Sequence, residues 1–224
     1  MNKIGLITIG QAPRLDIMED IQPIFGEHVE VLQRGALDNL SEDELLAIAP
    51  EQGDTVLVSC LRDGRSVTMA EEKILGLLQD CINSLEQNAV ACIMFLCTGD
   101  FGDRLSSRVP LIYPNKILKG LLPALCEEKE FIVLVPDEKQ KEEALKQWES
   151  PEMKVNVLPV SPYDGSREDF QKAAEQINAM KGRYVLMDCM GYSVEMKHLL
   201  ETLTGRTVLL PRVLAAAVAS AVIS

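Results

Sequence analysis

Short apolar runs alternate with amphipathic stretches along the whole chain. The apolar runs predict strands, and they occupy residues 4–9, 28–32, 55–59, 90–96, 131–135, 155–160, 184–187 and 207–210. The amphipathic stretches carry apolar residues at helical spacing and predict helices over residues 13–26, 41–50, 69–87, 116–127, 139–148, 167–180, 194–203 and 213–223. Strands that alternate with helices in this way are typical of parallel βαβ units. The pattern therefore predicts an α/β protein with doubly wound parallel sheets.

Two segments of the chain share a pattern that a generic α/β protein does not require. Residues 91–99 (ACIMFLCTG) and residues 183–191 (RYVLMDCMG) each read as a buried strand that follows a long amphipathic helix and ends in Cys-X-Gly. This repeat suggests two pseudo-symmetric domains that face each other across a cleft. We expect residues 1–112 with 207–224 to form the first domain and residues 113–206 to form the second. The last helix has few polar residues, so we expect it to pack back onto the N-terminal half.

Charge and composition narrow the choice of partners. The chain has 224 residues, and its 34 acidic and 22 basic side chains give a formal net charge of −12. Such a surface repels phosphate backbones and anionic lipid, so we expect neither nucleic acid nor a membrane as a partner. The N-terminus lacks the apolar core of a signal peptide, and Pro211 and Arg212 interrupt the apolar tail. We therefore expect a cytoplasmic protein, and a homodimer stays open.

The cysteine and histidine pattern predicts a protein without a metal or another cofactor. The six cysteines include no Cys-X-X-Cys pair, and the two histidines, His28 and His198, stand apart from every cysteine. A cytoplasmic location also argues against a disulfide framework. The chain carries neither a Walker motif nor the glycine fingerprint of a dinucleotide site.

Cys97 and Cys189 are the strongest candidates for chemistry, because ligands of open α/β sheets bind beyond the carboxyl ends of strands. The glycine two residues later allows a tight turn, and a helix expected after each turn would lower the thiol pKa. One cysteine could then act as a thiolate base and the other as a thiol acid. Asp188 argues mildly against a thiolate at Cys189. The alternative is that free cysteines are small buried apolar residues, which we prefer for the other four, Cys60, Cys81, Cys92 and Cys126.

Three further loops at strand ends could bind an anion. Gly10 supplies a turn after the first strand, and Arg14 could hold a carboxylate with two hydrogen bonds or could be a solvated helix-face arginine. Residues 59–65 (SCLRDGR) carry Arg62, which could bind a ligand or brace its loop through Asp63. Residues 33–38 (QRGALD) follow the second predicted strand and could also bind an anion, but the pattern there is a weaker indication of a ligand site.

At these residues the chain resembles the AroM family over its whole length. The resemblance rests on residues 8–16 (TIGQAPRLD), 35–38 (GALD), 62–65 (RDGR) and 187–192 (MDCMGY). The chain is more distantly similar to the cofactor-independent aspartate/glutamate racemase superfamily, which includes hydantoin racemases, maleate isomerases and arylmalonate decarboxylases. That similarity implies two pseudo-symmetric α/β domains with one catalytic cysteine from each. The sequence departs from the superfamily pattern after both cysteines, where Thr98-Gly99 and Met190 replace the usual Asn-Thr and Thr.

The resemblance implies a cofactor-independent racemase, epimerase or isomerase that acts on a small carboxylate-containing molecule. Cys97 and Cys189 would exchange a proton at the carbon next to the carboxylate. The residues expected to bind the substrate are Gly10, Gln11, Arg14, Ser59, Arg62, Thr98, Gly99, Gly191 and Tyr192. Decarboxylation or cis–trans isomerisation within the same superfamily is one alternative, and a non-catalytic carboxylate sensor is another.

Overall fold

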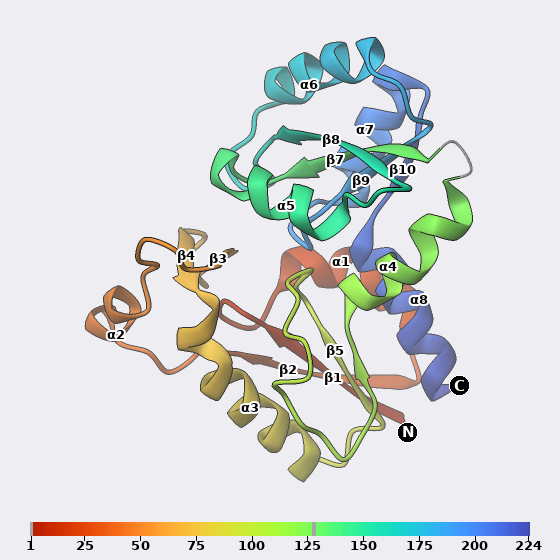
Figure 1. Ribbon diagram of the computed structural model, residues 1–224. Helices are drawn as coiled ribbons and strands as arrows, with labels where there is room; N and C mark the ends of the chain where they lie inside the picture. The colour runs from red at the N-terminus through yellow and green to blue at the C-terminus, as the bar shows by residue number, and fades with distance from the viewer. Residues whose placement is uncertain (1, 127–128) are drawn as a thin grey trace. The chain divides into compact units, whose positions relative to one another are not determined.

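The computed structural model describes residues 2–126 and 129–224. The chain divides into two compact units, of which the first comprises Met1–Pro114 with Ala215–Ser224 and the second Asn115–Leu214 (Figure 1). Each unit has its own parallel sheet and its own buried residues. In the described part of the chain, no helix has the length and apolar character needed to cross a membrane.

Unit 1 is built on a four-stranded parallel sheet in the order β2-β1-β5-β6. Its strands are β1 (Asn2–Thr8), β2 (Val29–Gly35), β5 (Cys92–Phe95) and β6 (Leu111–Ile112), and its helices include α1 (Leu15–Phe25), α2 (Glu42–Ala47) and α3 (Glu71–Gln87). Helix α3 packs its apolar face on the sheet, where a side chain at Gly5 would collide with Leu85. Glycine at position 5 therefore lets α3 approach β1 closely.

The third predicted strand does not join this sheet. Strand β3 (Val56–Cys60) pairs antiparallel with β4 (Ser66–Ala70), in a separate two-stranded sheet. Gly64 makes the reversal with a φ of 88°, a conformation that glycine adopts without steric cost. Because β4 extends to Ala70, helix α3 begins at Glu71, two residues after the start that the sequence pattern predicts. A short apolar run does not reveal which partner it will pair with, and this explains the wrong placement of the strand.

Unit 2 contains the second parallel sheet, in the order β10-β9-β7-β8. Its elements are α4 (Pro114–Leu125), β7 (Glu130–Val135), the 3₁₀ turn η1 (Glu138–Gln140), α5 (Lys141–Trp148), β8 (Lys154–Pro159), α6 (Arg167–Ala179), β9 (Tyr184–Met187), α7 (Val194–Thr204) and β10 (Thr207–Leu209). Residues of α4 and α5 pack on one face of the sheet, and residues of α6 and α7 pack on the other. The predicted end of the first of these helices, at residue 127, lies outside the described residues.

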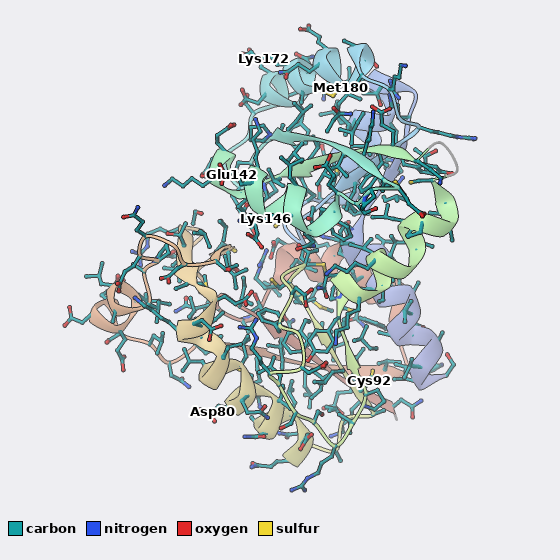
Figure 2. The ribbon with its side chains drawn as sticks, in the orientation of Figure 1. Asp80, Cys92, Glu142, Lys146, Lys172 and Met180 are labelled. Atoms are coloured by element: carbon teal, nitrogen blue, oxygen red, sulfur yellow. The ribbon has the colours of Figure 1, made fainter. Side chains whose placement is uncertain are left out.

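The polar faces of the helices in unit 2 are exposed, as the amphipathic pattern predicts. Glu142 and Lys146 project from α5, and Lys172 projects from α6 (Figure 2).

Between these two helices, beyond the end of β8, lies a cavity of about 500 Å³. Its rim carries charges of both signs, with ion pairs between Glu138 and Lys141 and between Asp169 and Lys172.

The two sheets have the same connectivity. When the strands of each parallel sheet are numbered in chain order, both sheets read second, first, third, fourth. Strands β5 and β9 are the third strands of their parallel sheets, and each lies between the first and the fourth. The fold is therefore α/β with two pseudo-symmetric parallel-sheet domains, and the segments that end in Cys-X-Gly occupy equivalent places in the two domains.

The boundary near the C-terminus differs from the expected one. Strand β10 pairs with β9 in unit 2, so residues 207–214 lie with the second unit and the return to unit 1 begins at Ala215. The burial of Val208 within the second sheet explains this placement. Helix α8 (Pro211–Ile223) then places Ser220 against α1, where its hydroxyl donates a hydrogen bond to the Ile24 carbonyl.

The burial of Ala219 in α8 leads to the first prediction. Ala219 is fully buried in unit 1, whereas Ala217 on the same helix is exposed. Ala219→Leu should destabilise the protein by about 1–3 kcal/mol, because the added methyl groups overfill a packed site. Ala217→Leu, the matched control, should change the urea midpoint little. Equal midpoints for the two variants would contradict the close packing of α8.

Candidate functional site

The two Cys-X-Gly turns have the same backbone geometry. Cys97 comes two residues after the end of β5, and Cys189 comes two residues after the end of β9. The N–H of Gly99 donates to the Cys97 sulfur at 3.2 Å, and the N–H of Gly191 donates to the Cys189 sulfur at 3.3 Å. Each thiol thus has an equivalent main-chain donor, the glycine N–H of its own turn, at the carboxyl edge of its own sheet.

A second repeated hydrogen bond fixes where each strand stops. The N–H of Leu96 donates to the Ile7 carbonyl of β1 at 2.7 Å, and the N–H of Asp188 donates to the Leu134 carbonyl of β7 at 2.8 Å. Each donor immediately precedes a cysteine. The last bond to the first strand therefore comes one residue before the sulfur in both units.

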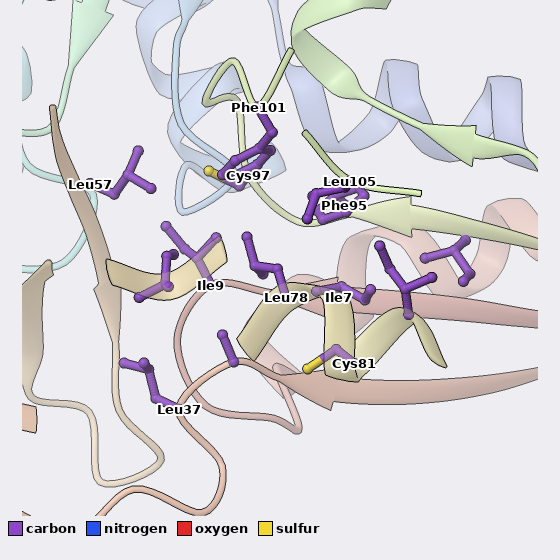
Figure 3. Packing of buried hydrophobic residues seen from close by; sticks show 14 of the residues in the cluster. Ile7, Ile9, Leu37, Leu57, Leu78, Cys81, Phe95, Cys97, Phe101 and Leu105 are labelled. Atoms are coloured by element: carbon purple, nitrogen blue, oxygen red, sulfur yellow. The ribbon is translucent and has the colours of Figure 1, made fainter. Parts of the chain in front are cut away.

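Cys97 lies in apolar surroundings. Its side chain is 8% exposed and belongs to the hydrophobic cluster of unit 1, beside Phe101 and away from Cys81 on α3 (Figure 3). A Cβ atom at Gly99 would lie 3.3 Å from the Cys97 sulfur and 3.2 Å from a Leu57 methyl carbon. Glycine therefore keeps the space beside the sulfur open. The half-buried Thr98 stands between the cysteine and the glycine.

The helix expected after Cys97 is absent, and an arginine holds the loop that replaces it. Arg104 donates to the carbonyls of Asp100 and Phe101 at 3.1 Å and 3.0 Å, and its guanidinium also pairs with Glu71 and Glu72 at the start of α3. Burial raises the pKa of the Glu71 carboxyl, and the bond to Arg104 opposes that rise. Residues 98–110 thus run as a loop into β6, whereas α7 does follow the second cysteine.

Cys189 is half-buried and has a phenol beside it. The Tyr163 hydroxyl lies 3.7 Å from the Cys189 sulfur. A Cβ atom at Gly191 would lie 2.7 Å from both Cζ and the hydroxyl oxygen of Tyr163, so the ring rests directly on the turn. Sequence reasoning did not single out Tyr163. The sequence feature that could have indicated Tyr163 is its position in a loop rich in Pro and Gly, which follows β8 at the carboxyl edge of the sheet.

Tyr192 and Asp188 support the second turn from within the unit. Tyr192, an expected substrate ligand, is fully buried, and its hydroxyl donates to the Val160 carbonyl at 2.6 Å. Burial raises the pKa of this phenol well above its ordinary value. Asp188 accepts a 2.5 Å hydrogen bond from the Trp148 indole. The structure therefore places the Tyr192 side chain in the core beneath the turn.

In unit 1 a single carboxylate joins three loops at the carboxyl edge of the sheet. One oxygen of Asp38 accepts from the Ala12 N–H at 2.7 Å and from Arg62 at 2.9 Å, and the other accepts from the Gly35 N–H at 2.8 Å. The Gln11 amide donates to the Leu37 carbonyl at 3.1 Å and accepts from the Arg62 N–H at 2.9 Å. Gln11 and Arg62 were expected to bind substrate, and the structure uses both as loop braces.

Gly10 and Arg14, two further expected ligands in unit 1, are also held by contacts within the protein. A Cβ atom at Gly10 would lie 2.4 Å from both the Cys60 carbonyl and the hydroxyl of the buried Ser59, so close approach to the hairpin requires glycine there. Arg14 is only 3% exposed, and two hydrogen bonds of 2.8 Å and 2.6 Å join its guanidinium to Asp16. The alternative of a solvated helix-face arginine is therefore wrong.

None of the other four cysteines is followed two residues later by a glycine. Burial raises the pKa of Cys81 to about 12 and that of Cys92 to about 11, and it also raises the pKa of Cys60. Cys126 is 3% exposed and packs between α4 and β7. Within residues 2–126 and 129–224, no three His, Cys, Asp or Glu side chains are grouped so that they could hold a metal ion.

Comparison with known proteins now assigns the family. The profile of the family described as AroM protein matches residues 4–223. The chain belongs to the AroM family. No curated protein matches this AroM family chain.

Solved structures resemble the AroM chain in fold. Allantoin racemase from Klebsiella pneumoniae has a TM-score of 0.68 at 11% identity, over 100% of this chain and 88% of its own. Unliganded arylmalonate decarboxylase has a TM-score of 0.63 at 11% identity, over 100% and 92%. Glutamate racemase from Francisella tularensis in complex with D-glutamate has a TM-score of 0.60 at 13% identity, over 98% and 80%. Identities this low show a shared fold.

The hydrogen bonds that Asp38 accepts from three loops lead to the second prediction. Asp38→Asn should lower the free energy of unfolding by about 1–3 kcal/mol, because an amide cannot accept all the hydrogen bonds that the carboxylate accepts. Asp80→Asn is the matched control, because Asp80 lies on the exposed face of α3 (Figure 2). Urea unfolding measures both variants. If Asp38→Asn lowers the free energy of unfolding no more than the control does, Asp38 does not hold the loops together.

The third prediction concerns the order in which the thiols react. With pKa values of about 12 and 11, Cys81 and Cys92 are thiolates at only about one part in ten thousand or less near neutral pH. Iodoacetamide should therefore label Cys97 and Cys189 ahead of Cys81 and Cys92, as peptide mass spectrometry would show. Labelling of all cysteines together, and only after unfolding, would favour a binding protein without reactive thiols.

Proposed function

We propose that this AroM family protein is a cofactor-independent racemase, epimerase or isomerase of small carboxylates, with Cys97 and Cys189 as its acid and base. The observation that carries the proposal is the repeated turn, in which a glycine N–H donates to a cysteine sulfur at 3.2 Å in one unit and 3.3 Å in the other. The fold supports it, because racemases and a decarboxylase share it.

The proposed chemistry is a proton exchange at the carbon next to the carboxylate. An N–H donor stabilises a thiolate more than a thiol, so either turn can hold the charged form. The thiolate takes the proton from carbon, and the electron pair of the C–H bond moves into the carboxylate group. The other thiol delivers its proton to the opposite face of the carbon and becomes the thiolate. The two cysteines thus exchange protonation states in each turnover, and no cofactor is consumed.

We base the assignment of substrate-binding groups on the hydrogen bonds that each candidate makes within the protein. The N–H groups of Gly99 and Gly191 point at sulfur, so we assign them to the thiolates and not to the carboxylate. Gln11 and Arg62 brace their loops. The half-buried Thr98, adjacent to Cys97, is the residue we propose as a carboxylate ligand.

The fold also supports one related reaction. Arylmalonate decarboxylase is among the structures that match over the whole chain. In a decarboxylation, loss of carbon dioxide would leave a carbanion, and one cysteine would protonate it. A substrate panel that includes disubstituted malonates distinguishes this reaction from racemisation.

The fourth prediction tests the proposed function directly. In D₂O the protein should replace the hydrogen next to the carboxylate of its substrate with deuterium, which proton NMR detects across a panel of small chiral carboxylates. Cys97→Ser and Cys189→Ser should each slow the exchange by at least about a hundredfold, because serine is a far weaker acid of similar size. Cys60→Ser, at the end of β3, is the control and should retain activity.

Several results would decide against the proposal. Exchange that persists in both serine variants, or that stops after dialysis against EDTA, would exclude a cofactor-independent two-thiol mechanism. The mechanism also requires that both thiols reach one substrate carbon. Dibromoacetone, a short bifunctional thiol reagent, should therefore join Cys97 to Cys189 in the native protein. Alkylation of each thiol without a cross-link would argue against a shared substrate.

A further inference from the structure

We propose that Tyr163 is a further functional residue of this site, with its hydroxyl donating a hydrogen bond to the Cys189 thiolate. The two atoms lie 3.7 Å apart, a distance within reach of a hydrogen bond to sulfur. The role in proton exchange rests on the proposed function, whereas the contact itself can be tested without any substrate.

The loop that carries Tyr163 is built to hold the ring in place. The Ser161 hydroxyl accepts from the N–H groups of Tyr163 and Asp164 at 3.1 Å and 3.0 Å, and the Ser161 carbonyl accepts from the Gly165 N–H at 3.1 Å. Ser166 then caps α6 with a reciprocal bond to Asp169. The tyrosine therefore projects from a short hydrogen-bonded turn, which limits the freedom of its ring.

The cysteine turn is shaped to receive the ring. Position 191 has no room for a side chain, because a Cβ atom there would lie 2.7 Å from the Tyr163 hydroxyl and 2.9 Å from Pro162. The glycine thus does two things, since its N–H donates to the sulfur and its missing side chain admits the phenol. Both donors converge on one atom, the sulfur of Cys189.

Charged groups of both signs lie near the second turn in unit 2. The fully buried Arg212 donates to the Met190 carbonyl at 2.9 Å, so its positive charge favours a thiolate at Cys189. Asp188 precedes the cysteine and is paired with the Trp148 indole, and its negative charge disfavours a thiolate next to it. Tyr192 is buried, and its raised pKa keeps it neutral. Of these phenols and carboxylates, Tyr163 is the one whose hydroxyl reaches the sulfur, so its hydrogen bond can offset the effect of Asp188.

The fifth prediction is the effect of Tyr163→Phe on the pH profile of Cys189 alkylation by iodoacetamide. Loss of a donor to the thiolate should raise the midpoint by about one pH unit, which lowers the thiolate fraction about tenfold below the midpoint. A more basic thiolate is about threefold more nucleophilic, so the net rate should fall about threefold near neutral pH. Above both midpoints the variant should react faster than the wild type.

These crossing profiles separate a hydrogen bond from simple shielding. Phenylalanine fills the same space as tyrosine, and a ring that only blocks access would leave the profile unchanged. Tyr184→Phe is the matched control, because Tyr184 lies in β9 of the same unit and packs on the α5 side of the sheet. An unchanged midpoint in Tyr163→Phe, or faster alkylation at every pH, would overturn the inference.

A second variant keeps the test decisive if Tyr163→Phe does not fold. Gly191→Ala must displace the ring, so it should raise the same midpoint, and an unchanged midpoint would count against the contact. Because alkylation needs no substrate, the outcome is independent of turnover. A raised midpoint in a protein that exchanges no carbon-bound hydrogen would support the hydrogen bond between Tyr163 and Cys189. It would contradict only the proposed function.

Discussion

The last hydrogen bond of a parallel ladder fixes the position of each candidate thiol. Leu96 bonds back to β1, and Asp188 bonds back to β7, one residue before the cysteine in each case. Pairing to a neighbouring strand ends there, and the chain must turn at the carboxyl edge of the sheet. The glycine two residues further on then directs its N–H to the sulfur. Without that ladder bond neither turn would have a defined start, and the sulfur would not meet its donor.

Most polar residues at the edge of the first sheet hold the loops together. Asp38 joins three loops, Gln11 joins two of them to the hairpin, and Arg62 closes the same network. Charged and amide groups that are already hydrogen-bonded within the protein are less suited to bind a substrate, because a ligand would have to replace those bonds. The structure thus uses Asp38, Gln11 and Arg62 to support the loops at this edge.

The two cysteines share a backbone motif but not their surroundings. Cys97 packs in an apolar cluster beside Phe101, whereas Cys189 is half-buried beside the Tyr163 hydroxyl. The elements that follow also differ, because a loop held by Arg104 follows the first turn and α7 follows the second. Pseudo-symmetry of the fold therefore does not make the surroundings of the two thiols equivalent.

The sequence by itself determined the features that depend on local order. Periodicity of apolar residues predicted most helices and strands, and the repeated strand followed by Cys-X-Gly predicted two related domains with their cysteines at equivalent strand ends. Only the tertiary structure decided which polar groups meet. Tyr163 and Cys189 are 26 residues apart, and Arg62 and Asp38 are 24 apart, so no spacing rule pairs them. It also decided that β3 pairs with β4 outside the main sheet. The reason is physical, because local periodicity specifies which face of an element is buried, whereas long-range partners are chosen by the packing of the whole unit.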